Sequence, residues 1–342
     1  MKTACLCLCL SLSIGAMALA PASELHHFTK RASEIDDRTR EHPEIDFVFT
    51  DPKGKAADTE QAVVDTGVRS RGRLVLWLMG HNEPLAERIA GYGLHYLQVS
   101  YANRWFSKLT KEQLSEGDTI GKIRLEAATG EDHSPLVSIP RPDSLEERAF
   151  QMVKALHEER AEGKWGQFLS RDRKGLDWEK VILAGISHGS TTAARLAIHR
   201  RVDRVVMFSG PRDNTEQWQA LPSATPANRY FGFTHVLDGG WTADHYCRSW
   251  QLLGLQAFGP VVDVDKVGPP YGDSRRLVTD AEVGGDSGRA HNASVPGGAA
   301  VKDAEGNFLH ETVWTYLFTH PVEKTGMAVP PDPDCTMETG LK

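Results

Sequence analysis

Cysteine is scarce in this chain and unevenly placed. Three of the five cysteines, Cys5, Cys7 and Cys9, lie in an apolar segment at the start, which leaves Cys247 and Cys335 for the remainder. No Cys-x-x-Cys pair and no His/Cys spacing of the metal-binding kind is present, so the sequence predicts no metal site. The two remaining cysteines permit a single disulfide, and two free thiols are the alternative.

The sequence also lacks a dense block of charge. It contains 39 Lys and Arg residues against 46 Asp and Glu residues, a formal net charge of −7 that is spread along the chain. No basic patch is dense enough to indicate a nucleic-acid partner. The composition therefore excludes a nucleic-acid-binding protein of the usual basic type.

Long apolar runs are missing except at the N-terminus. Lys2 precedes an uncharged run over residues 4–20 that ends in Ala18-Leu19-Ala20, with Ala20-Pro21-Ala22 as a second possible cleavage site. This run is short for a membrane span and has the small-residue ending of a secretory signal peptide. We expect residues 1–22 to be a signal peptide and the protein to be secreted or periplasmic, without a membrane span after cleavage. An uncleaved N-terminal anchor is the alternative.

The rest of the chain is organised around one stretch. Residues 181–184 are a short apolar run typical of a strand that is buried on both faces. Gly185-Ile186-Ser187-His188-Gly189 follows at once, and residues 190–198 have helical character. A strand, G-x-S-x-G and a helix in this order predict a nucleophile elbow, a sharp turn that exposes the serine above the sheet. A solvated serine in an ordinary glycine-rich turn is the alternative.

Strands and helices alternate on both sides of this elbow. The pattern predicts strands at residues 74–79, 94–99, 202–208, 229–237 and 277–278, and helices at 85–92, 143–160, 243–253 and 308–318. Such alternation predicts an α/β fold with a mostly parallel central sheet and helices on both faces. We expect an N-terminal extension at 23–70 with an early antiparallel strand at 45–49, a catalytic domain at 71–320 with an insertion at 101–142, and a loosely held Pro-rich tail at 321–342.

From about Arg73 onward the chain resembles the α/β-hydrolase superfamily, specifically at the elbow and more loosely elsewhere. The resemblance implies a secreted, esterase-like or lipase-like serine hydrolase that needs no cofactor and cleaves a small-molecule or polymeric ester through an acyl-enzyme intermediate. A peptidase or amidase of the same fold is one alternative. A catalytically inactive, hydrolase-like binding protein is the other.

The resemblance also assigns a triad in the family's order of Ser, acid, His. Ser187 is the expected nucleophile and His291, in the glycine-rich loop 284–298, the expected base. Asp238, which follows the strand at 229–237, is the expected acid. His310 and His320 are the alternative bases, and Asp244 and Asp213 are the alternative acids.

Two backbone N–H groups are expected to form the oxyanion hole. One belongs to His188, directly after the nucleophile. The other is assigned to His81, in the loop after the strand at 74–79, where this chain has Met79-Gly80 in place of the His-Gly of many relatives. The insertion at 101–142 carries three early aromatic residues (Tyr101, Trp105 and Phe106) and is expected to form a wall or lid of the substrate pocket, with a surface excursion as the alternative.

A second serine stands in a sequence that suggests catalysis. Gly285-Asp286-Ser287-Gly288 is similar to the serine environment of trypsin-like proteases. Those enzymes place their histidine and aspartate far upstream on paired β-barrels, which the strand–helix alternation of this chain contradicts. Ser287 is therefore not the expected nucleophile.

Overall fold

The apolar runs of the sequence form the middle of a nine-stranded sheet in the computed structural model, which describes residues 24–213, 216–238, 247–333 and 335. The expected signal peptide lies outside these residues. The strands are β1 Leu25–Arg31, β2 Thr59–Asp65, β3 Leu74–Trp77, β4 His95–Gln98, β5 Val181–Ile186, β6 Arg204–Phe208, β7 Tyr230–His235, β8 Val261–Asp263 and β9 Arg276–Thr279. The α-helices are α1 Ala32–Ile35, α2 Glu83–Gly91, α3 Lys111–Ser115, α4 Thr119–Thr129, α5 Leu145–Glu159, α6 His188–His199, α7 Glu216–Gln219, α8 Arg248–Leu252, α9 Ser287–Ala293 and α10 Glu311–Thr319.

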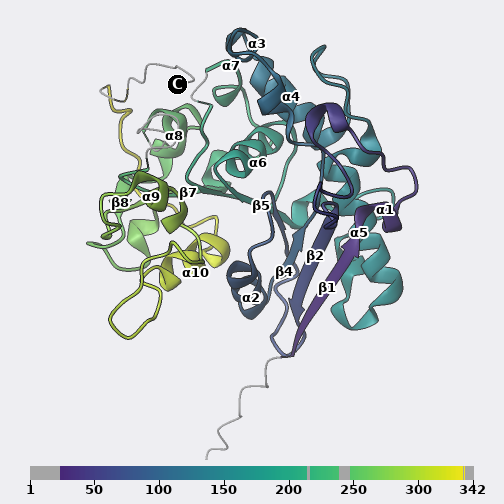
Figure 1. Cartoon of the computed structure of the whole chain (residues 1–342). Coiled ribbons are helices and arrows are strands. Elements are labelled where there is room, and N and C mark those ends of the chain that lie inside the picture. Colours follow the sequence, from purple (N-terminus) through teal and green to yellow (C-terminus); the bar gives the residue numbers. More distant parts are fainter. Residues whose placement is uncertain (1–23, 214–215, 239–246, 334, 336–342) are drawn as a thin grey trace, which may run out of the picture.

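The sheet order is β1-β2-β4-β3-β5-β6-β7-β9-β8. Figure 1 labels six of these strands, from β1 at one edge to β8 at the other. The pairs β1/β2 and β2/β4 are antiparallel, and all later pairs are parallel. This arrangement confirms the expected α/β-hydrolase fold, with a mostly parallel sheet and helices on both faces.

Residues of each central strand alternate between two cores. In β3, Leu74 and Leu76 pack into the core beneath α4, α5 and α6, whereas Val75 and Trp77 pack into the core beneath α2 and α10. The sequence of a strand that is covered on both faces is a continuous apolar run, because the side chains on both faces are buried. The same property made the central strands recognisable from the sequence.

The chain reverses direction across the sheet at β3. From β3 it passes through α2 to β4 on one side, and later enters β5 on the other side of β3. Ligands of open α/β sheets bind where such a reversal opens a crevice at the carboxyl ends of the strands. The loop after β3 and the elbow after β5 both lie at this place.

Two expectations about secondary structure are wrong, and one strand was not predicted. Residues 45–49 are not a strand, because the segment has a 3-10 turn at Pro43–Ile45 and makes only isolated bridges through Phe47 and Thr50. The antiparallel strands of the extension are β1 and β2, which pair over their full length. The loop 284–298 contains helix α9, and an additional strand, β8, precedes β9.

The tail after residue 320 is held on the body wherever the structure describes it. Arg275 donates hydrogen bonds to the carbonyl oxygens of Val322 and Lys324 at 2.9 and 2.8 Å. A disulfide joins Cys247 to Cys335. The expectation of a loosely held tail is therefore wrong for this part of the chain.

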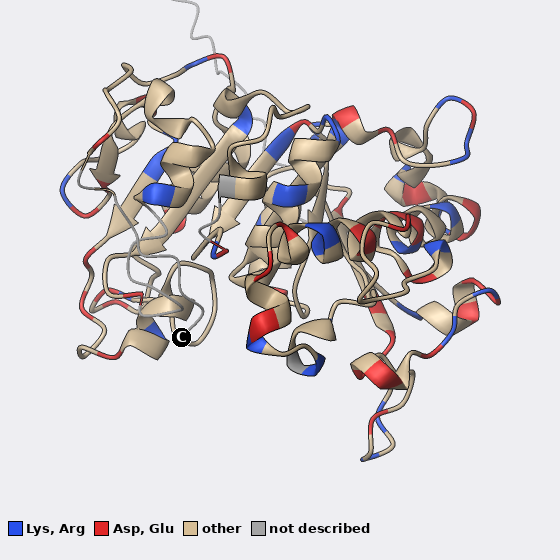
Figure 2. Cartoon of the chain, turned by 90° about the horizontal axis from the view of Figure 1, so that it is seen from above, with Lys and Arg blue, Asp and Glu red and all other residues tan. Residues whose placement is uncertain are grey.

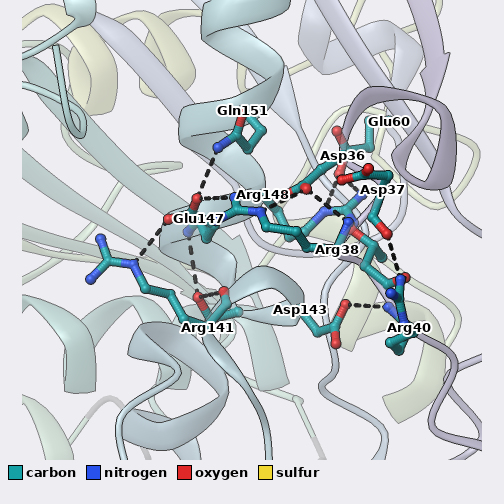
Figure 3. A network of polar contacts seen from close by, with 12 residues as sticks. Asp36, Asp37, Arg38, Arg40, Glu60, Arg141, Asp143, Glu147, Arg148 and Gln151 are labelled. Atoms are coloured by element: carbon teal, nitrogen blue, oxygen red, sulfur yellow. Dashed lines mark hydrogen bonds and ion pairs between the residues drawn. The ribbon is translucent and has the colours of Figure 1, made fainter.

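The N-terminal extension is fixed to α5 by a network of ion pairs (Figure 3). Arg38 bridges Asp36 and Glu147 at 2.8 and 2.6 Å, and Arg148 donates to Glu60 at 2.9 and 2.6 Å. Arg148 and Glu60 are both buried, so neither charge is left without compensation inside the protein. The network holds the antiparallel edge of the sheet in place.

Charges of both signs are distributed over the helices and loops seen from above in Figure 2, in agreement with the mixed charge of the sequence. Among the described residues, no helix combines the length and the apolar composition that crossing a membrane requires.

Candidate active site

Ser187 occupies the turn between β5 and α6 in a strained backbone conformation. Its φ is 57° and its ψ is −118°, values that a residue with a side chain rarely adopts. A Cβ on Gly185 would lie 2.5 Å from the carbonyl carbon of Gly189, and a Cβ on Gly189 would lie 1.8 Å from the carbonyl oxygen of Leu78. Both glycines are therefore needed for β3, β5 and α6 to meet this closely, and the turn has the form of a nucleophile elbow.

His291 and Asp238 are hydrogen-bonded to each other. His291 Nδ1 lies 2.8 Å from Asp238 Oδ1 and 3.0 Å from Oδ2, and the Asp238 carboxylate is buried. Asp238 follows β7, whereas His291 lies in α9, which Ser209 holds by donating to the His291 carbonyl oxygen at 2.7 Å. A carboxylate at Nδ1 fixes the tautomer in which Nε2 is free to accept a proton.

The alternative bases and acids have other partners. His310 contacts Asp265 at 3.2 Å and His320 contacts Asp273 at 3.0 Å. Asp213 accepts two hydrogen bonds from Arg124 at 2.8 and 2.7 Å. Asp244 lies outside the described residues.

An arginine that we did not predict stands beside the nucleophile. Arg212 Nη1 donates to Ser187 Oγ at 2.5 Å and lies 3.4 Å from His291 Nε2. Its backbone N–H donates to Thr191 Oγ1 at 3.0 Å, which fixes the loop after β6 to helix α6. Among the described residues no direct hydrogen bond joins Ser187 Oγ to His291 Nε2, so the guanidinium bridges the two groups.

A second buried arginine holds the ring of His188. Arg124 Nη1 donates to His188 Nδ1 at 2.7 Å, and its guanidinium lies 4.6 Å from the centre of the Phe106 ring. Burial, and then the charges of Arg124 and Arg212, hold the pKa of His188 well below its usual range. The His188 side chain is therefore neutral at pH 7. It is unsuited to the role expected of His291, which must carry a positive charge beside a carboxylate.

A cavity of about 760 Å³ opens beside the elbow. Its lining includes both residues expected at the oxyanion hole and part of the insertion, namely Met79, Gly80, His81, Tyr101, Phe106 and His188. Gly189 packs against Leu78 and Met79, so the start of α6 and the loop after β3 are adjacent. The oxyanion role of the His188 and His81 N–H groups remains a prediction.

The aromatic residues of the insertion have different environments. Trp105 is buried with 1% of its surface exposed and belongs to the core under α4, whereas the half-buried Phe106 lines the cavity. Tyr101 is buried and also lines the cavity. The insertion thus forms part of the cavity wall, while Trp105 supports it from within.

Ser287 is the first residue of α9 and is exposed. The preceding Asp286 caps this helix, because its carboxylate accepts hydrogen bonds from the N–H groups of Gly288 and Arg289 at 2.8 and 3.1 Å. The sequence that is similar to a protease motif is therefore a helix N-terminus.

Three clusters of potential metal ligands occur within the described residues. One of them, Cys247, Asp332 and Cys335, contains the two cysteines of the disulfide, and two others remain. One consists of His27, Glu83 and Glu87 at the surface. The other consists of Asp263, Asp265 and Asp280, and there Lys266 pairs with both Asp263 and Asp280. Neither cluster includes a residue of the candidate site.

Arg212 and Arg124 are the site residues that the sequence analysis missed. One signal was available for Arg212, since Arg212-Asp213 lies in the loop that follows β6, the strand next to β5. Charged residues at the carboxyl end of a strand that neighbours the elbow lie at the ligand-binding edge of a parallel sheet. Arg124 lies in α4, far from the elbow in sequence, and only the packing of α4 on α6 brings it there.

No protein-family model and no curated protein matches this chain in sequence. Solved structures do match. A putative dienelactone hydrolase from Klebsiella pneumoniae is 11% identical, with 81% of this chain and 94% of that chain covered and a TM-score of 0.37. Esterase B from Lactobacillus rhamnosis is 13% identical, with 77% of each chain covered and a TM-score of 0.35.

A third match, esterase Est22, is 12% identical with a TM-score of 0.25, and the alignment spans about half of it (51%), against 59% of this chain. These superpositions are too weak to bear on activity. The assignment of the fold rests on the strand order and on the elbow.

Proposed function

We propose that this chain is a serine hydrolase that cleaves carboxylic esters through an acyl-enzyme intermediate. Ser187 is the nucleophile, His291 the general base and acid, and Asp238 the residue that orients His291. The observation that carries the proposal is the strained Ser187 on its elbow together with the buried contact between Asp238 and His291 Nδ1. A strained non-glycine residue persists only where its surroundings impose it, and such residues concentrate at active sites.

The proposed reaction has two halves. Ser187 Oγ attacks the ester carbonyl carbon while His291 Nε2 takes the hydroxyl proton, and the N–H groups of His188 and His81 stabilise the oxyanion. The alcohol leaves with that proton, and an acyl-serine remains. Water then attacks the acyl-serine, His291 again takes and returns the proton, and the carboxylic acid is released.

Arg212 must be accommodated in this scheme. A hydroxyl oxygen can accept a hydrogen bond from Arg212 and still donate its own proton to His291. The guanidinium charge favours the alkoxide character that Ser187 acquires on attack. The serine is thus held by the arginine in the free protein, and the attack requires His291 Nε2 to come within hydrogen-bond distance of Oγ.

The test is labelling with a fluorophosphonate probe, which reacts only with an activated serine. We expect wild-type protein to be labelled and Ser187→Ala to lose labelling completely. Ser287→Ala is the matched control, and it should be labelled like wild type because Ser287 only begins α9.

Labelling that survives in Ser187→Ala and disappears in Ser287→Ala would show that the nucleophile is Ser287 and that the assignment to Ser187 is wrong. If the wild-type protein is not labelled at all, the inactive, hydrolase-like binding protein becomes the better explanation. Comparing p-nitrophenyl esters with aminoacyl amides on active protein then separates an esterase from a peptidase or amidase.

We also propose that the protein is exported. The Cys247–Cys335 disulfide supports this proposal, because disulfides persist mainly in oxidising compartments. Cell fractionation followed by N-terminal sequencing tests it, and cleavage after Ala20 or Ala22 is the expected result.

A further inference from the structure

The ring of His188 is held on one side by a group that can only donate hydrogen bonds. Arg124 Nη1 lies 2.7 Å from His188 Nδ1, and Arg124 Nε and Nη2 donate to the two oxygens of Asp213 at 2.8 and 2.7 Å. A guanidinium stays charged and has no acceptor, so His188 Nδ1 must accept. A neutral imidazole that accepts at Nδ1 carries its hydrogen on Nε2. The contact therefore fixes His188 as a donor at Nε2.

The two histidines of the site are thus prepared for opposite roles. At His291 the partner of Nδ1 is the carboxylate of Asp238, which accepts and leaves Nε2 able to take a proton. At His188 the partner of Nδ1 is a cation, which donates and leaves the hydrogen on Nε2. Burial, and then the charges of Arg124 and Arg212, hold the pKa of His188 well below its usual range, so the ring takes up no second proton at pH 7.

The donor at Nε2 opens on the cavity beside the elbow. His188 lines this cavity together with Phe106, whose ring stands edge-to-face against the imidazole at a centre-to-centre distance of 3.7 Å. Nε2 has no hydrogen-bond partner among the residues that the structure describes, and it is not one of their enclosed polar atoms. The half-buried ring thus has one nitrogen held by an arginine and the other available to a ligand.

The lining of the cavity favours a polar, uncharged ligand. The residues of the lining that carry a full charge, Asp46, Lys55 and Arg104, are all exposed. Its less exposed part includes five residues with polar, uncharged side chains, namely Thr59, Gln61, Gln98, Ser100 and Asn103. Hydroxyl and amide groups of this kind form hydrogen bonds with neutral oxygen atoms.

We propose that the His188 side chain is a hydrogen-bond donor to the substrate, and that Ser187 acts on esters that carry a further uncharged oxygen, in an ether or a hydroxyl group, which accepts from Nε2. The part of this inference that concerns hydrolysis rests on the proposed function. Arg124 is a positioning residue, because it sets the tautomer of His188 from behind the ring.

Nuclear magnetic resonance of isotope-labelled protein tests the tautomer directly. Correlations between the carbon-bound ring hydrogens and the ring nitrogens show which nitrogen carries a hydrogen, and the signals of His188 are those that His188→Phe lacks. We expect Nε2 to carry the hydrogen at pH 7 and Nδ1 to carry none. A hydrogen on Nδ1 overturns the inference, because Arg124 could not then donate to it.

A double substitution tests the role of Arg124. Arg124→Met/Asp213→Asn removes the donor together with the carboxylate that compensates it, so that neither buried charge is left without its partner. The hydrogen should then be shared between Nδ1 and Nε2 of His188. A ring that keeps its hydrogen on Nε2 alone in this variant overturns the positioning role, and the measurement on wild type does not depend on it.

Pairs of esters that differ by the replacement of methylene groups with oxygen test the selection. Diethylene glycol monomethyl ether acetate and heptyl acetate differ on the alcohol side, and ethyl methoxyethoxyacetate and ethyl heptanoate differ on the acyl side. The ratio of kcat/KM within each pair is compared between wild type and His188→Phe, so that differences in intrinsic reactivity cancel. In at least one pair we expect this ratio to be about 3-fold to 10-fold higher in wild type, the factor that one net hydrogen bond provides.

The matched control is His199→Phe. His199 is exposed at the opposite end of α6, and its replacement should leave both ratios within about twofold of wild type. Equal ratios in wild type and His188→Phe for both pairs overturn the inference and leave the proposed function standing.

If no ester is hydrolysed and the fluorophosphonate probe does not react, the proposed function fails, and resonance measurements on Ser187→Ala decide the recognition by themselves. A shift of the His188 Nε2 signal on addition of diethylene glycol monomethyl ether acetate, larger than the shift with heptyl acetate, supports the donor role. No shift, or the same shift with both esters, overturns it.

Discussion

Asp238 and Asp213 occupy similar places in the sheet but bind different charged partners. Each follows a strand of the same sheet, and each carboxylate is buried. Asp238 gives both oxygens to His291 Nδ1, whereas Asp213 gives both to Arg124. In the proposed mechanism the first contact prepares His291 as a proton acceptor, whereas the second compensates the buried charge of Arg124.

Asp238→Asn should therefore lower kcat about 10,000-fold, because an asparagine stabilises the wrong tautomer of His291 and cannot stabilise its charged form. The melting temperature should change little. Steady-state kinetics on the best ester checks the first statement, and thermal unfolding checks the second.

Two further aspartates serve as comparisons. Asp213→Asn leaves Arg124 buried without its anion and should cost about 3–5 kcal/mol of unfolding free energy. Asp244→Asn should have a small effect on kcat. If Asp244→Asn has the large effect and Asp238→Asn the small one, the acid of the triad is Asp244.

At the scale of elements, the N-terminal extension depends on charged contacts with α5 and with the loop before it. His42 Nε2 lies 2.8 Å from Asp143 Oδ2, and Asp143 also accepts from the N–H of Arg40 at 3.1 Å, a contact drawn in Figure 3. The hydrogen bond that the His42 ring donates to the Asp143 carboxylate raises the pKa of His42 above its ordinary value of 6.5.

This pKa shift makes the stability of the extension depend on pH. Because the folded-state pKa of His42 is raised, its contribution is fully present below pH 6.5 and is lost as the pH rises through the folded-state value. The melting temperature of wild type should thus exceed that of His42→Gln by more at pH 5.5 than at pH 8.5. Thermal unfolding across this range measures the difference.

The partner residue provides the control for this prediction. In an Asp143→Asn background, His42→Gln should change the pH dependence much less, since the carboxylate that raises the pKa of His42 most is absent and only the exposed Glu44 remains. A difference between wild type and His42→Gln that stays constant from pH 5.5 to pH 8.5 would contradict the assignment.

At the scale of the whole molecule, the disulfide cross-links the C-terminal segment to the body of the protein. Cys247 precedes α8, and Cys335 lies 88 residues later, beyond the last helix. Replacing both cysteines by serine should lower the free energy of unfolding by about 2–4 kcal/mol, because the cross-link restricts the unfolded chain.

Thermal unfolding with and without a thiol reductant checks this prediction. The reductant should lower the melting temperature of wild type and leave that of Cys247→Ser/Cys335→Ser unchanged. A wild-type melting temperature that does not respond to complete reduction would show that noncovalent contacts, among them the hydrogen bonds from Arg275, suffice to hold the tail.

Local sequence determined the elements whose signals are complete within a few residues. The central strands are continuous apolar runs, and the elbow combines two glycines and a serine between a strand and a helix. The order of these elements then placed Ser187, Asp238 and His291 after β5, β7 and β9, and the structure brings Asp238 and His291 into contact.

Other elements depend on packing that the sequence does not display. Helix α4 was not predicted because nearly all of its residues are buried, including Arg124 and Glu126, so no polar face alternates with an apolar one. The segment at 45–49 has the alternation of a strand, but no neighbouring strand pairs with it along its length. The helix around His291 begins in a Gly- and Ser-rich stretch where its cap, Asp286, is the main signal.

The sequence by itself thus determined the central parallel strands and the elbow, and it supplied the candidates Ser187, Asp238 and His291, because each signal is local or follows from the order of elements. Only the tertiary structure decided which charged groups surround the nucleophile. Arg124 and Arg212 lie 88 positions apart in the chain, and both approach residues of the elbow and α6, because α4 packs on α6 and β6 pairs with β5. Contacts between such distant residues arise from packing and are absent from any short pattern in the sequence.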